Sequence, residues 1–424
     1  MGKTTLVEQF AKEYDHFITL NLERYDDNDL FEQHKDVHTL LDNLLLAKNI
    51  NPDQLESTLL FIDEVQENTA AISMLRYFYE DYPQLSVIAA GSLLEHAMRE
   101  VSHFPVGRVQ LMYIFPVNFQ EYLLARGKDQ LLQRLQDVPL KEATHRAAMS
   151  YFHEYAIIGG MPEVVARYLE TGAVSDLPMI YESIWSTYKD DVLKYAKSNA
   201  EARVIRHLLD TAPLYLDKRI TFQNFGNSNY KSREVGESFR SLDDARVLQL
   251  IYPSTSMSLP ILPDRKKSPR MQFLDSGIVN HVLGIQGEML AMQDLDHAYR
   301  GALIPHIIIQ ELLSLNTFSY KKPHFWVRQK KQSDAELDLL HVYSNKLVPI
   351  EVKSGPAGKL RSLHQFIERS GIPYAVRFYS GKFSIEQHVT PGGKQYTLMN
   401  LPYFLATLLD EYLEYFFTVL TEDS

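Results

Sequence analysis

The chain has 424 residues, of which 45% are apolar and 23% are charged, and it contains no cysteine. A chain of this length is too long for a single hydrophobic core, so we expect about two or three domains. The lack of cysteine excludes disulfides, thiolate nucleophiles and zinc sites with sulfur ligands. The formal net charge of −11 excludes nucleic-acid binding over the whole surface, so any such contact must come from a local basic patch.

Two basic stretches could supply such a patch, residues 265–270 and 321–331, although charge patterning alone favours a solvated loop in each case. No apolar run reaches the ~18 residues of a membrane span, so we expect no membrane partner. The first residues lead directly into an amphipathic stretch with Glu8 and Lys12, which is not the form of a signal peptide. We therefore expect a cytoplasmic protein.

The chain opens with the second half of the phosphate-binding pattern G-x-x-x-x-G-K-[ST]. In that pattern backbone N–H groups cradle phosphates, the lysine reaches the β- and γ-phosphates, and the first hydroxyl holds Mg²⁺. We assign these last two roles to Lys3 and Thr4. The next residues repeat apolar side chains at helical spacing, with Leu6, Phe10 and Tyr14 as a core-facing stripe. The matching motif residues are Gly2, Lys3, Thr4 and Thr5.

Residues 58–62 form an apolar run that ends in Asp63 and Glu64. A run that is apolar on both faces suits a parallel strand between two helix layers, and its carboxyl end is where ligands bind in open α/β sheets. Asp63 would belong to the Mg²⁺ shell and Glu64 would activate the attacking water. The alternative is a core strand with ordinary acidic ends, but the upstream Gly-Lys-Thr favours a site for ATP and Mg²⁺.

Residues 85–92 predict a third strand that ends at the same edge of the sheet. Ser92 could sense the γ-phosphate or the water, or it could cap the following helix. Five short segments now stand in a fixed order: Lys-Thr-Thr-Leu at 3–6, Phe-Ile-Asp-Glu-Val-Gln at 61–66, Ala-Gly-Ser-Leu-Leu at 90–94, Val-Gly-Arg-Val at 106–109 and Phe-Pro-Val-Asn-Phe-Gln-Glu-Tyr at 115–122.

In this combination the chain resembles a group of prokaryotic AAA-family ATPases that carry a C-terminal domain of unknown function. The resemblance covers nearly the whole chain. It implies a P-loop sheet that binds ATP and Mg²⁺, and it places Arg108 at a Gly-Arg position where the arginine can act as a sensor or finger; a surface salt bridge is the alternative. Related AAA proteins often form rings, so a homo-oligomer is among the expected states.

Members of that group have a first strand and a leading glycine before Gly-Lys-Thr, and this sequence shows neither. A phosphate loop without its first half loses backbone donors, and the sheet has a gap near its middle. We hypothesise that the start is mis-assigned, with a GUG valine codon read as the initiator. Upstream in-frame sequence that encodes an apolar strand and a glycine would support this, and a stop codon would contradict it. Under this hypothesis the chain as written binds ATP poorly or not at all. A non-catalytic fragment is then a third possibility beside an active enzyme and a binding protein.

The middle of the chain predicts a helical, lid-like region over residues 131–199, interrupted by Gly-Gly-Met-Pro at 159–162. Glycines end helices and proline begins them, so this tetrapeptide separates two helices. Residues 200–285 predict a winged helix, a module that reads DNA with its second helix or docks protein. Its expected elements are a short strand at 220–222, a helix that begins at Ser232, a strand at 248–251, a wing at 264–270 and a strand at 271–275.

The C-terminal third contains a second group of acids. Residues two apart in a strand share a face, so Glu336 lies with Asp338 and Glu351 lies with Lys353. A hairpin with its turn at 344–346 would bring Asp338 close to Glu351. Two carboxylates and a lysine at one hairpin can hold Mg²⁺ and position a water against a phosphodiester.

This arrangement resembles the restriction-endonuclease-like PD-(D/E)xK core, although the proline before the aspartate is missing. The resemblance implies Asp338, Glu351 and Lys353 as the site, with Glu311 on a helix at 307–315 as a fourth group. An exposed strand with an ion pair is the alternative. The remaining expected elements are a helix at 359–369, a strand at 374–380 and a last helix from Leu401 to about Thr421.

The sequence therefore predicts an α/β chain with a P-loop AAA-type parallel sheet, a helical segment, a winged helix and an α+β restriction-endonuclease-like domain. The expected function is an AAA-type ATPase coupled to a nuclease-like domain that acts on DNA or RNA. The alternative is an ATP-regulated, non-catalytic module that binds nucleic acid or protein. The expected segments are 1–130 (ATPase core), 131–199 (helical), 200–285 (winged helix) and 286–424 (nuclease-like).

Overall fold

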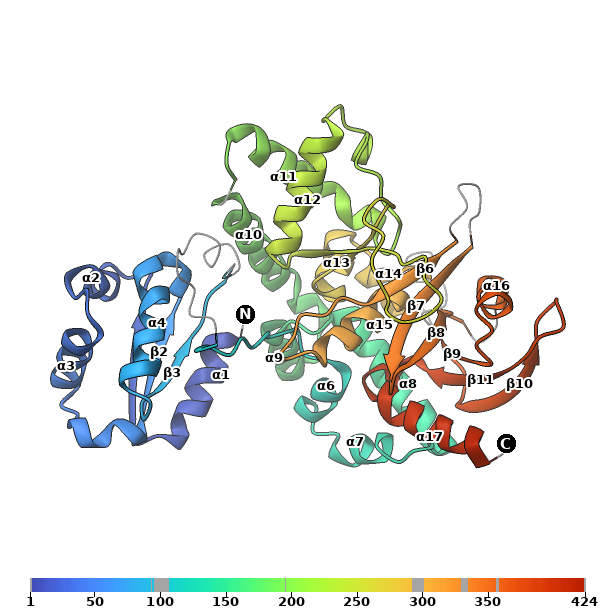
Figure 1. Ribbon diagram of the computed structural model, residues 1–424, viewed down its shortest axis with the longest axis horizontal. Coiled ribbons are helices and arrows are strands. Elements are labelled where there is room, and N and C mark those ends of the chain that lie inside the picture. Colours follow the sequence, from blue (N-terminus) through green and yellow to red (C-terminus); the bar gives the residue numbers. More distant parts are fainter. Residues whose placement is uncertain are drawn as a thin grey trace. The chain divides into compact units, whose positions relative to one another are not determined.

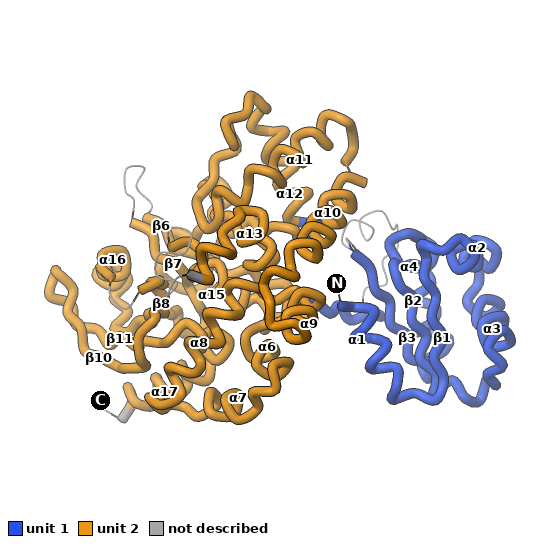
Figure 2. The backbone as a smooth tube through the Cα atoms, turned by 180° about the vertical axis from the view of Figure 1, so that it is seen from behind, with its two compact units in different colours: residues 1–114, 244–246 blue, residues 115–243, 247–424 orange. Residues whose placement is uncertain are grey.

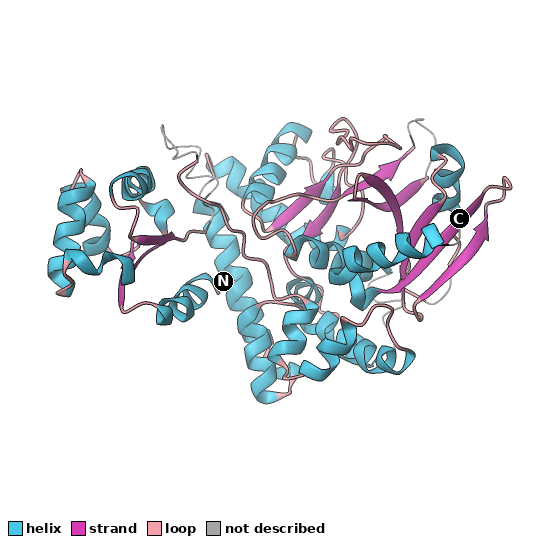
Figure 3. Cartoon of the chain, turned by 60° about the horizontal axis from the view of Figure 1, so that its bottom comes forward, coloured by secondary structure: helices cyan, strands magenta, loops and turns pink. Residues whose placement is uncertain are grey.

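The structure is a computed structural model that describes residues 2–92, 94, 107–194, 196–291, 301–328, 335–355 and 358–422. Helices and strands occur throughout, as an α/β chain requires (Figure 3). The chain forms two compact units, residues 1–114 with 244–246 and residues 115–243 with 247–424 (Figure 2). The expected segments 131–199, 200–285 and 286–424 thus lie mainly in one unit.

The first unit is built on a parallel sheet in the order β1-β2-β3. Every residue of the central strand β2 is buried. Leu60 and Ile62 pack into one core and Leu59 and Phe61 into another, which confirms the prediction of a strand apolar on both faces. The strands are β1 (His16–Asn21), β2 (Thr58–Asp63) and β3 (Ser86–Ala89).

Helices cover both faces of this sheet (Figure 1). On one face Val7 of α1 and Ala11, just after this helix, pack against Phe61, while α2, α3 and α4 pack on the other. The predicted stripe was wrong for Leu6 and Phe10, which are 47% and 41% exposed, whereas Tyr14 packs against the core. The side that faces the sheet lies one residue further along the helix. The helices are α1 (Lys3–Phe10), α2 (Tyr25–Gln33), α3 (Val37–Lys48) and α4 (Thr69–Asp81).

The second unit contains a mixed six-stranded sheet in the order β10-β11-β9-β8-β7-β6. The β7–β8 hairpin is antiparallel, and β8 pairs parallel to β9 after a crossover through α16 (Arg361–Ser370). Both the hairpin and this helix–strand order were predicted. The strands are β6 (His324–Val327), β7 (Glu336–Tyr343), β8 (Lys346–Val352), β9 (Tyr374–Tyr379), β10 (Ser384–Val389) and β11 (Gln395–Pro402).

The predicted start of the last helix was wrong. Leu401 and Pro402 end β11, where they pair with β9, because the hydrogen bonds of the sheet fix this part of the chain as a strand. A 3₁₀ segment, Tyr403–Leu408, follows, and α17 (Leu409–Glu422) begins only after it. No helix in the described ranges combines the length and the apolar character needed to cross a membrane.

A group of helices precedes this sheet in the chain, and the Gly-Gly-Met-Pro break lies within it. As predicted, α8 ends at Ile158 and α9 begins at Pro162. A Cβ atom on Gly160 would lie 2.1 Å from the carbonyl oxygen of Val117, so this close approach of two backbones requires glycine. The helices are α6 (Phe119–Ala125), α7 (Asp129–Leu135), α8 (Glu142–Ile158), α9 (Pro162–Thr171), α10 (Pro178–Lys194), α13 (Ser276–Val282), α14 (Gln286–Ala291) and α15 (Leu303–Ser314).

Residues 199–273 contain most of the elements expected between 200 and 285. These are α12 (Ser232–Asp244) and an antiparallel pair, β4 (Leu248–Ile251) with β5 (Arg270–Phe273). A further helix, α11 (Asn199–Thr211), precedes them. The predicted strand at 220–222 was wrong. Among the described residues, Arg219 forms an isolated bridge with Arg270 of β5, and the Ile220 N–H donates to the Pro269 carbonyl at 2.9 Å. These isolated contacts beside β5 do not continue as a regular strand.

Candidate functional site

The carboxyl end of β2 carries the first predicted group. Asp63 is only 6% exposed, and its Oδ2 atom accepts a hydrogen bond from the Thr4 hydroxyl at 2.8 Å. Its other oxygen accepts the backbone N–H of Glu64 at 3.0 Å. The start of α1 and the end of β2 thus meet, and they present a hydroxyl and a carboxylate, the oxygen donors that Mg²⁺ prefers.

Glu64 follows directly in the left-handed backbone region, with φ of 51°, a conformation that costs a non-glycine residue free energy and often marks functional positions. Gln66 donates to Glu64 Oε2 at 2.6 Å and the Ser92 hydroxyl approaches the same oxygen at 3.4 Å. The sequence pattern did not single out Gln66. The available signals were its place two residues after Glu64 and its inclusion in the segment 61–66 that carries the family resemblance.

The remaining residues of the motif surround the first turn of α1. Gly2 precedes the helix with φ of 81°, which glycine adopts without steric cost. The N–H groups of a first helical turn favour an anion. Lys3 is half-buried and Thr5 is exposed. These groups, together with Thr4 and Asp63, fit a phosphate with its Mg²⁺.

Arg108 is paired with a residue of α4. Its Nε atom lies 3.1 Å from Glu80 Oε1, and Arg76 lies 2.9 Å from the same oxygen. All three side chains are partly exposed, so this is the surface ion pair that the sequence left open as the alternative. A role of Arg108 as a sensor stays a prediction.

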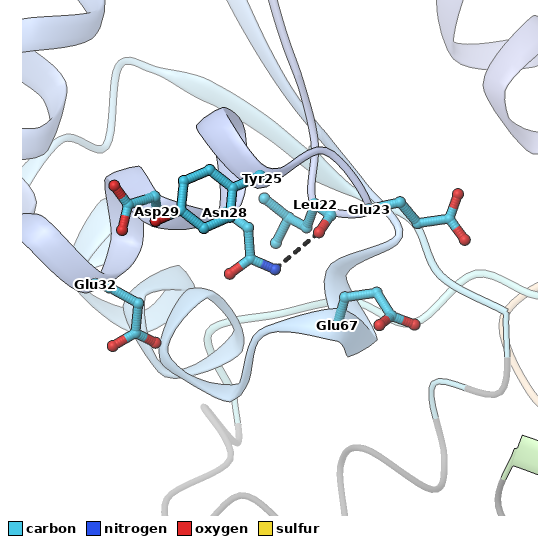
Figure 4. Close-up of a pocket in the computed structure, with 7 residues that line it drawn as sticks. All are labelled: Leu22, Glu23, Tyr25, Asn28, Asp29, Glu32 and Glu67. Carbon is cyan, nitrogen blue, oxygen red and sulfur yellow. Dashed lines mark hydrogen bonds between the residues drawn. The ribbon is translucent and has the colours of Figure 1, made fainter.

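A cavity of about 610 Å³ opens beside the end of β1 (Figure 4). Leu22 lines it and donates its N–H to the Asp63 carbonyl at 3.0 Å, and Asn28 donates to the Leu22 carbonyl at 2.8 Å. The carboxylates that line this cavity would repel a polyphosphate, so the cavity does not suit one. The acidic lining residues are Glu23, Asp29, Glu32 and Glu67.

The second unit contains a buried arginine among carboxylates. Arg270 is 5% exposed; its Nε donates to Glu336 Oε1 at 2.6 Å and its Nη2 to Asp338 Oδ1 at 3.2 Å. Asp217 Oδ1 lies 3.8 Å from Nη1. Burial alone would lower the pKa of Arg270, but the carboxylates outweigh it and raise the pKa. The basic run at 265–270 predicted an exposed patch and gave no sign of this role for Arg270, because all three acids lie more than 50 residues away in the chain.

The hairpin brings the predicted acids together. The second oxygen of Asp338 accepts the backbone N–H of Val352 at 2.8 Å, and Lys353 donates to Glu351 Oε1 at 2.5 Å. Burial, and then the charge of Asp338, raise the pKa of Glu351. Within the part of the chain that the structure describes, the buried Oε2 atom of Glu351 has no hydrogen-bond partner. Asp338, Glu351 and Lys353 therefore form one group. Arg270 contacts this group through its hydrogen bond to Asp338.

Glu311 lies apart from this group in its contacts. It accepts the Phe119 N–H at 3.0 Å and the Tyr155 hydroxyl at 2.7 Å, so it holds the first turn of α6. Burial raises the pKa of Glu311 to about 7. Across the described residues, no three His, Asp or Glu side chains are arranged to hold a metal ion.

Because the folded-state pKa of Glu311 lies above the ordinary value of 4.5, the folded protein retains a proton that the unfolded chain has lost between pH 4.5 and 7. Stability therefore falls as the pH rises through this window, by roughly 3 kcal/mol for this group. Glu311→Gln cannot ionise, so its unfolding midpoint should fall less between pH 5 and pH 8. Tryptophan fluorescence in urea would measure it, with the exposed Glu414→Gln as control. Equal pH dependence in both variants and the wild type would contradict the assignment.

The comparisons with known proteins agree with this geometry in the first unit. Residues 1–123 match the family model described as AAA domain. The chain thus has an AAA-type N-terminal domain. The match includes Lys3, Thr4, Asp63 and Glu64, and it supports an AAA-family ATPase with a nucleotide site, usually one that takes Mg²⁺.

Two further family models match the rest of the chain. Residues 149–289 match a Domain of unknown function (DUF8612), and residues 300–401 match a Domain of unknown function (DUF4143). The C-terminal domain of unknown function that the resemblance implied is therefore present behind the AAA domain. No curated protein matched the chain. No solved structure matched it either.

Proposed function

We propose that this protein is an ATP-dependent switch whose second unit binds a partner without cutting it. The observation that carries the nucleotide half is the 2.8 Å hydrogen bond from Thr4 to Asp63, because it joins the phosphate motif to the acidic strand end. Thr4 and Asp63 would hold Mg²⁺, which would supply positive charge to neutralise the phosphates. In this proposal Lys3 binds the phosphates, Glu64 holds the attacking water and Ser92 lies beside Glu64.

The contacts of Arg270 support binding rather than cleavage in the second unit. Both oxygens of Asp338 already accept protein donors, one from Arg270 and one from Val352. A buried guanidinium with a full positive charge neutralises the acids that a divalent cation would otherwise need to meet. We therefore propose that Asp338, Glu351 and Lys353 have a structural role, and that Arg270 takes the place of a metal ion.

A metal-dependent nuclease is the second candidate. It is favoured by the unpartnered Oε2 atom of Glu351 and by Lys353 two residues later. Incubation of plasmid DNA and of RNA with Mg²⁺ or Mn²⁺ separates the two candidates. Cleavage by the wild type that disappears in Asp338→Ala would establish the nuclease and overturn the proposal of a non-cutting unit.

The proposed ATP site of the first unit is tested by titrating a fluorescent ATP analogue in the presence of Mg²⁺. A charge-assisted contact contributes about 1.5–3 kcal/mol, so Lys3→Ala should weaken binding by roughly 10- to 100-fold. The matched control is Lys12→Ala, which removes an exposed lysine just after the same helix. Equal affinities for the wild type and Lys3→Ala would remove the assignment of this site.

A further inference from the structure

The basic run at residues 265–270 contains both exposed and buried cations. Arg270, at the start of β5, is buried among acids, whereas Arg265 and Lys266 are exposed. The structure thus removes Arg270 from the basic patch seen in the sequence and leaves a smaller basic tip on the surface of the second unit.

Backbone hydrogen bonds hold this tip in a defined turn. Asp264 Oδ1 accepts the Lys266 N–H at 3.1 Å and the Asp264 carbonyl accepts the Lys267 N–H at 3.1 Å. The Asp264 N–H in turn bonds the Pro253 carbonyl at 2.7 Å, which closes the base of the loop. The cations are therefore presented on an ordered turn, so fewer conformations are lost when a ligand binds.

A further cation, Arg240, comes from α12. Burial raises the pKa of the Tyr252 hydroxyl, whereas Arg240 and Arg265 both lower it and Asp243 raises it. Both guanidinium groups thus act on the same tyrosine, one from the helix and one from the loop. Arg240 is exposed, like Arg265. Helix and loop therefore both carry a cation close to Tyr252, which directly precedes the Pro253 carbonyl at the base of the loop.

The acids close to these cations are already engaged. Asp243 is paired with Lys322, and Glu237 is 2.8 Å from Arg233. Asp264 accepts the N–H groups of its own turn. Lys322 thus offsets the charge of Asp243, and Arg233 with Arg240 offsets that of Glu237. Arg265 and Lys266 are exposed to an external anion.

We propose that Arg240, Arg265 and Lys266 form a contact surface for the phosphate backbone of double-stranded nucleic acid. The proposal rests on the proposed function, since it names the partner that the second unit would hold. Cations on a helix and on a neighbouring turn can meet phosphates at two places along a duplex, and such contacts position a protein without reading sequence. The net charge of −11 repels a polyanion from most of the remaining surface, so binding should depend strongly on these residues.

The test measures binding of a labelled 20-base-pair DNA duplex to the full-length chain by fluorescence anisotropy at several salt concentrations. Loss of about two phosphate contacts should reduce the slope of log affinity against log salt by about two. Arg265→Glu with Lys266→Glu should therefore show this reduction and a roughly 10-fold or greater loss of affinity at low salt. Arg240→Glu alone should show a smaller change of the same kind.

A double variant with the same change in net charge, Arg134→Glu with Arg146→Glu, is the control, since both residues are exposed on α7 and α8. The proposal is overturned if the wild type does not bind the duplex, if the control loses affinity equally, or if the loop variant keeps the wild-type salt slope. Parallel titrations with an RNA duplex of the same sequence distinguish the two sources of phosphate. Because these titrations contain no ATP and no divalent cation, their result is independent of ATP binding and of cleavage.

Discussion

Arg270→Met is expected to destabilise the second unit by about 3–5 kcal/mol, because it removes the cation from a buried set of acids and leaves their charges uncompensated. Glu336, Asp338 and Asp217 would all lose a partner. The chain contains two tryptophans, Trp185 and Trp326, which both lie in this unit. Urea unfolding followed by tryptophan fluorescence therefore reports on the affected unit alone.

The matched control for this variant is Arg219→Met. Arg219 lies 3.8 Å from Glu336 and its side chain is 36% exposed, so its loss should cost no more than about 1 kcal/mol. Burial raises the pKa of Asp217 to about 7, so lowering the pH toward 5 protonates this acid. The loss of stability caused by Arg270→Met should therefore be smaller at pH 5. A variant as stable as the wild type at pH 8 would rule out Arg270 as the internal cation. Stability restored by Mn²⁺ would show that the freed acids can hold a divalent ion.

Glu64→Gln is expected to lower ATP hydrolysis by about 10²- to 10⁴-fold, the usual contribution of a positioned general base. The amide cannot accept a proton from water, but it keeps the size of the side chain and its contact with Gln66. Nucleotide binding should therefore persist while phosphate release falls. A coupled phosphate-release assay, run beside the binding titration, separates the two effects.

The control for Glu64→Gln is Glu67→Gln, which makes the same chemical change at an exposed position three residues later. Hydrolysis by this control should equal that of the wild type. If Glu64→Gln hydrolyses ATP at the wild-type rate, Glu64 is not the base, and its left-handed backbone has a structural cause only.

The binding surface and the nucleotide site lie in different units of the chain. The phosphate motif belongs to residues 1–114, whereas the basic tip and the cluster around Arg270 belong to the second unit. Regulation of one by the other would appear as a change in duplex affinity on addition of ATP. By thermodynamic reciprocity, duplex DNA would then change the affinity for ATP by the same factor.

Local patterns in the sequence were sufficient for several parts of this fold. The buried strand from Thr58 to Asp63 follows from a run apolar on both faces, and the β7–β8 hairpin follows from alternation around a short turn. The approach of Asp338 to Glu351 needed only the period of a strand. The break at Gly159–Pro162 likewise depends on backbone properties of the residues themselves.

Other features depended on contacts between distant residues, which no local pattern encodes. The sequence showed that α1 is a helix, but the position of the sheet decided that Val7 and Ala11, rather than Leu6 and Phe10, are buried. Glu311 was predicted as a metal ligand, yet its contacts come from Phe119, 192 residues away.

Arg270 gives the clearest case of this division. Its sequence neighbours are basic, and charge patterning alone placed it on a solvated surface with Arg265 and Lys266. The fold instead pairs β5 with β4 and brings Arg270 to β7, where burial in a low-dielectric interior makes its ion pairs with Glu336 and Asp338 strong. The sequence by itself determined which residues carry charge and which segments form strands and helices. Only the tertiary structure decided which charges meet, because that depends on segments that are far apart in the chain and adjacent in space.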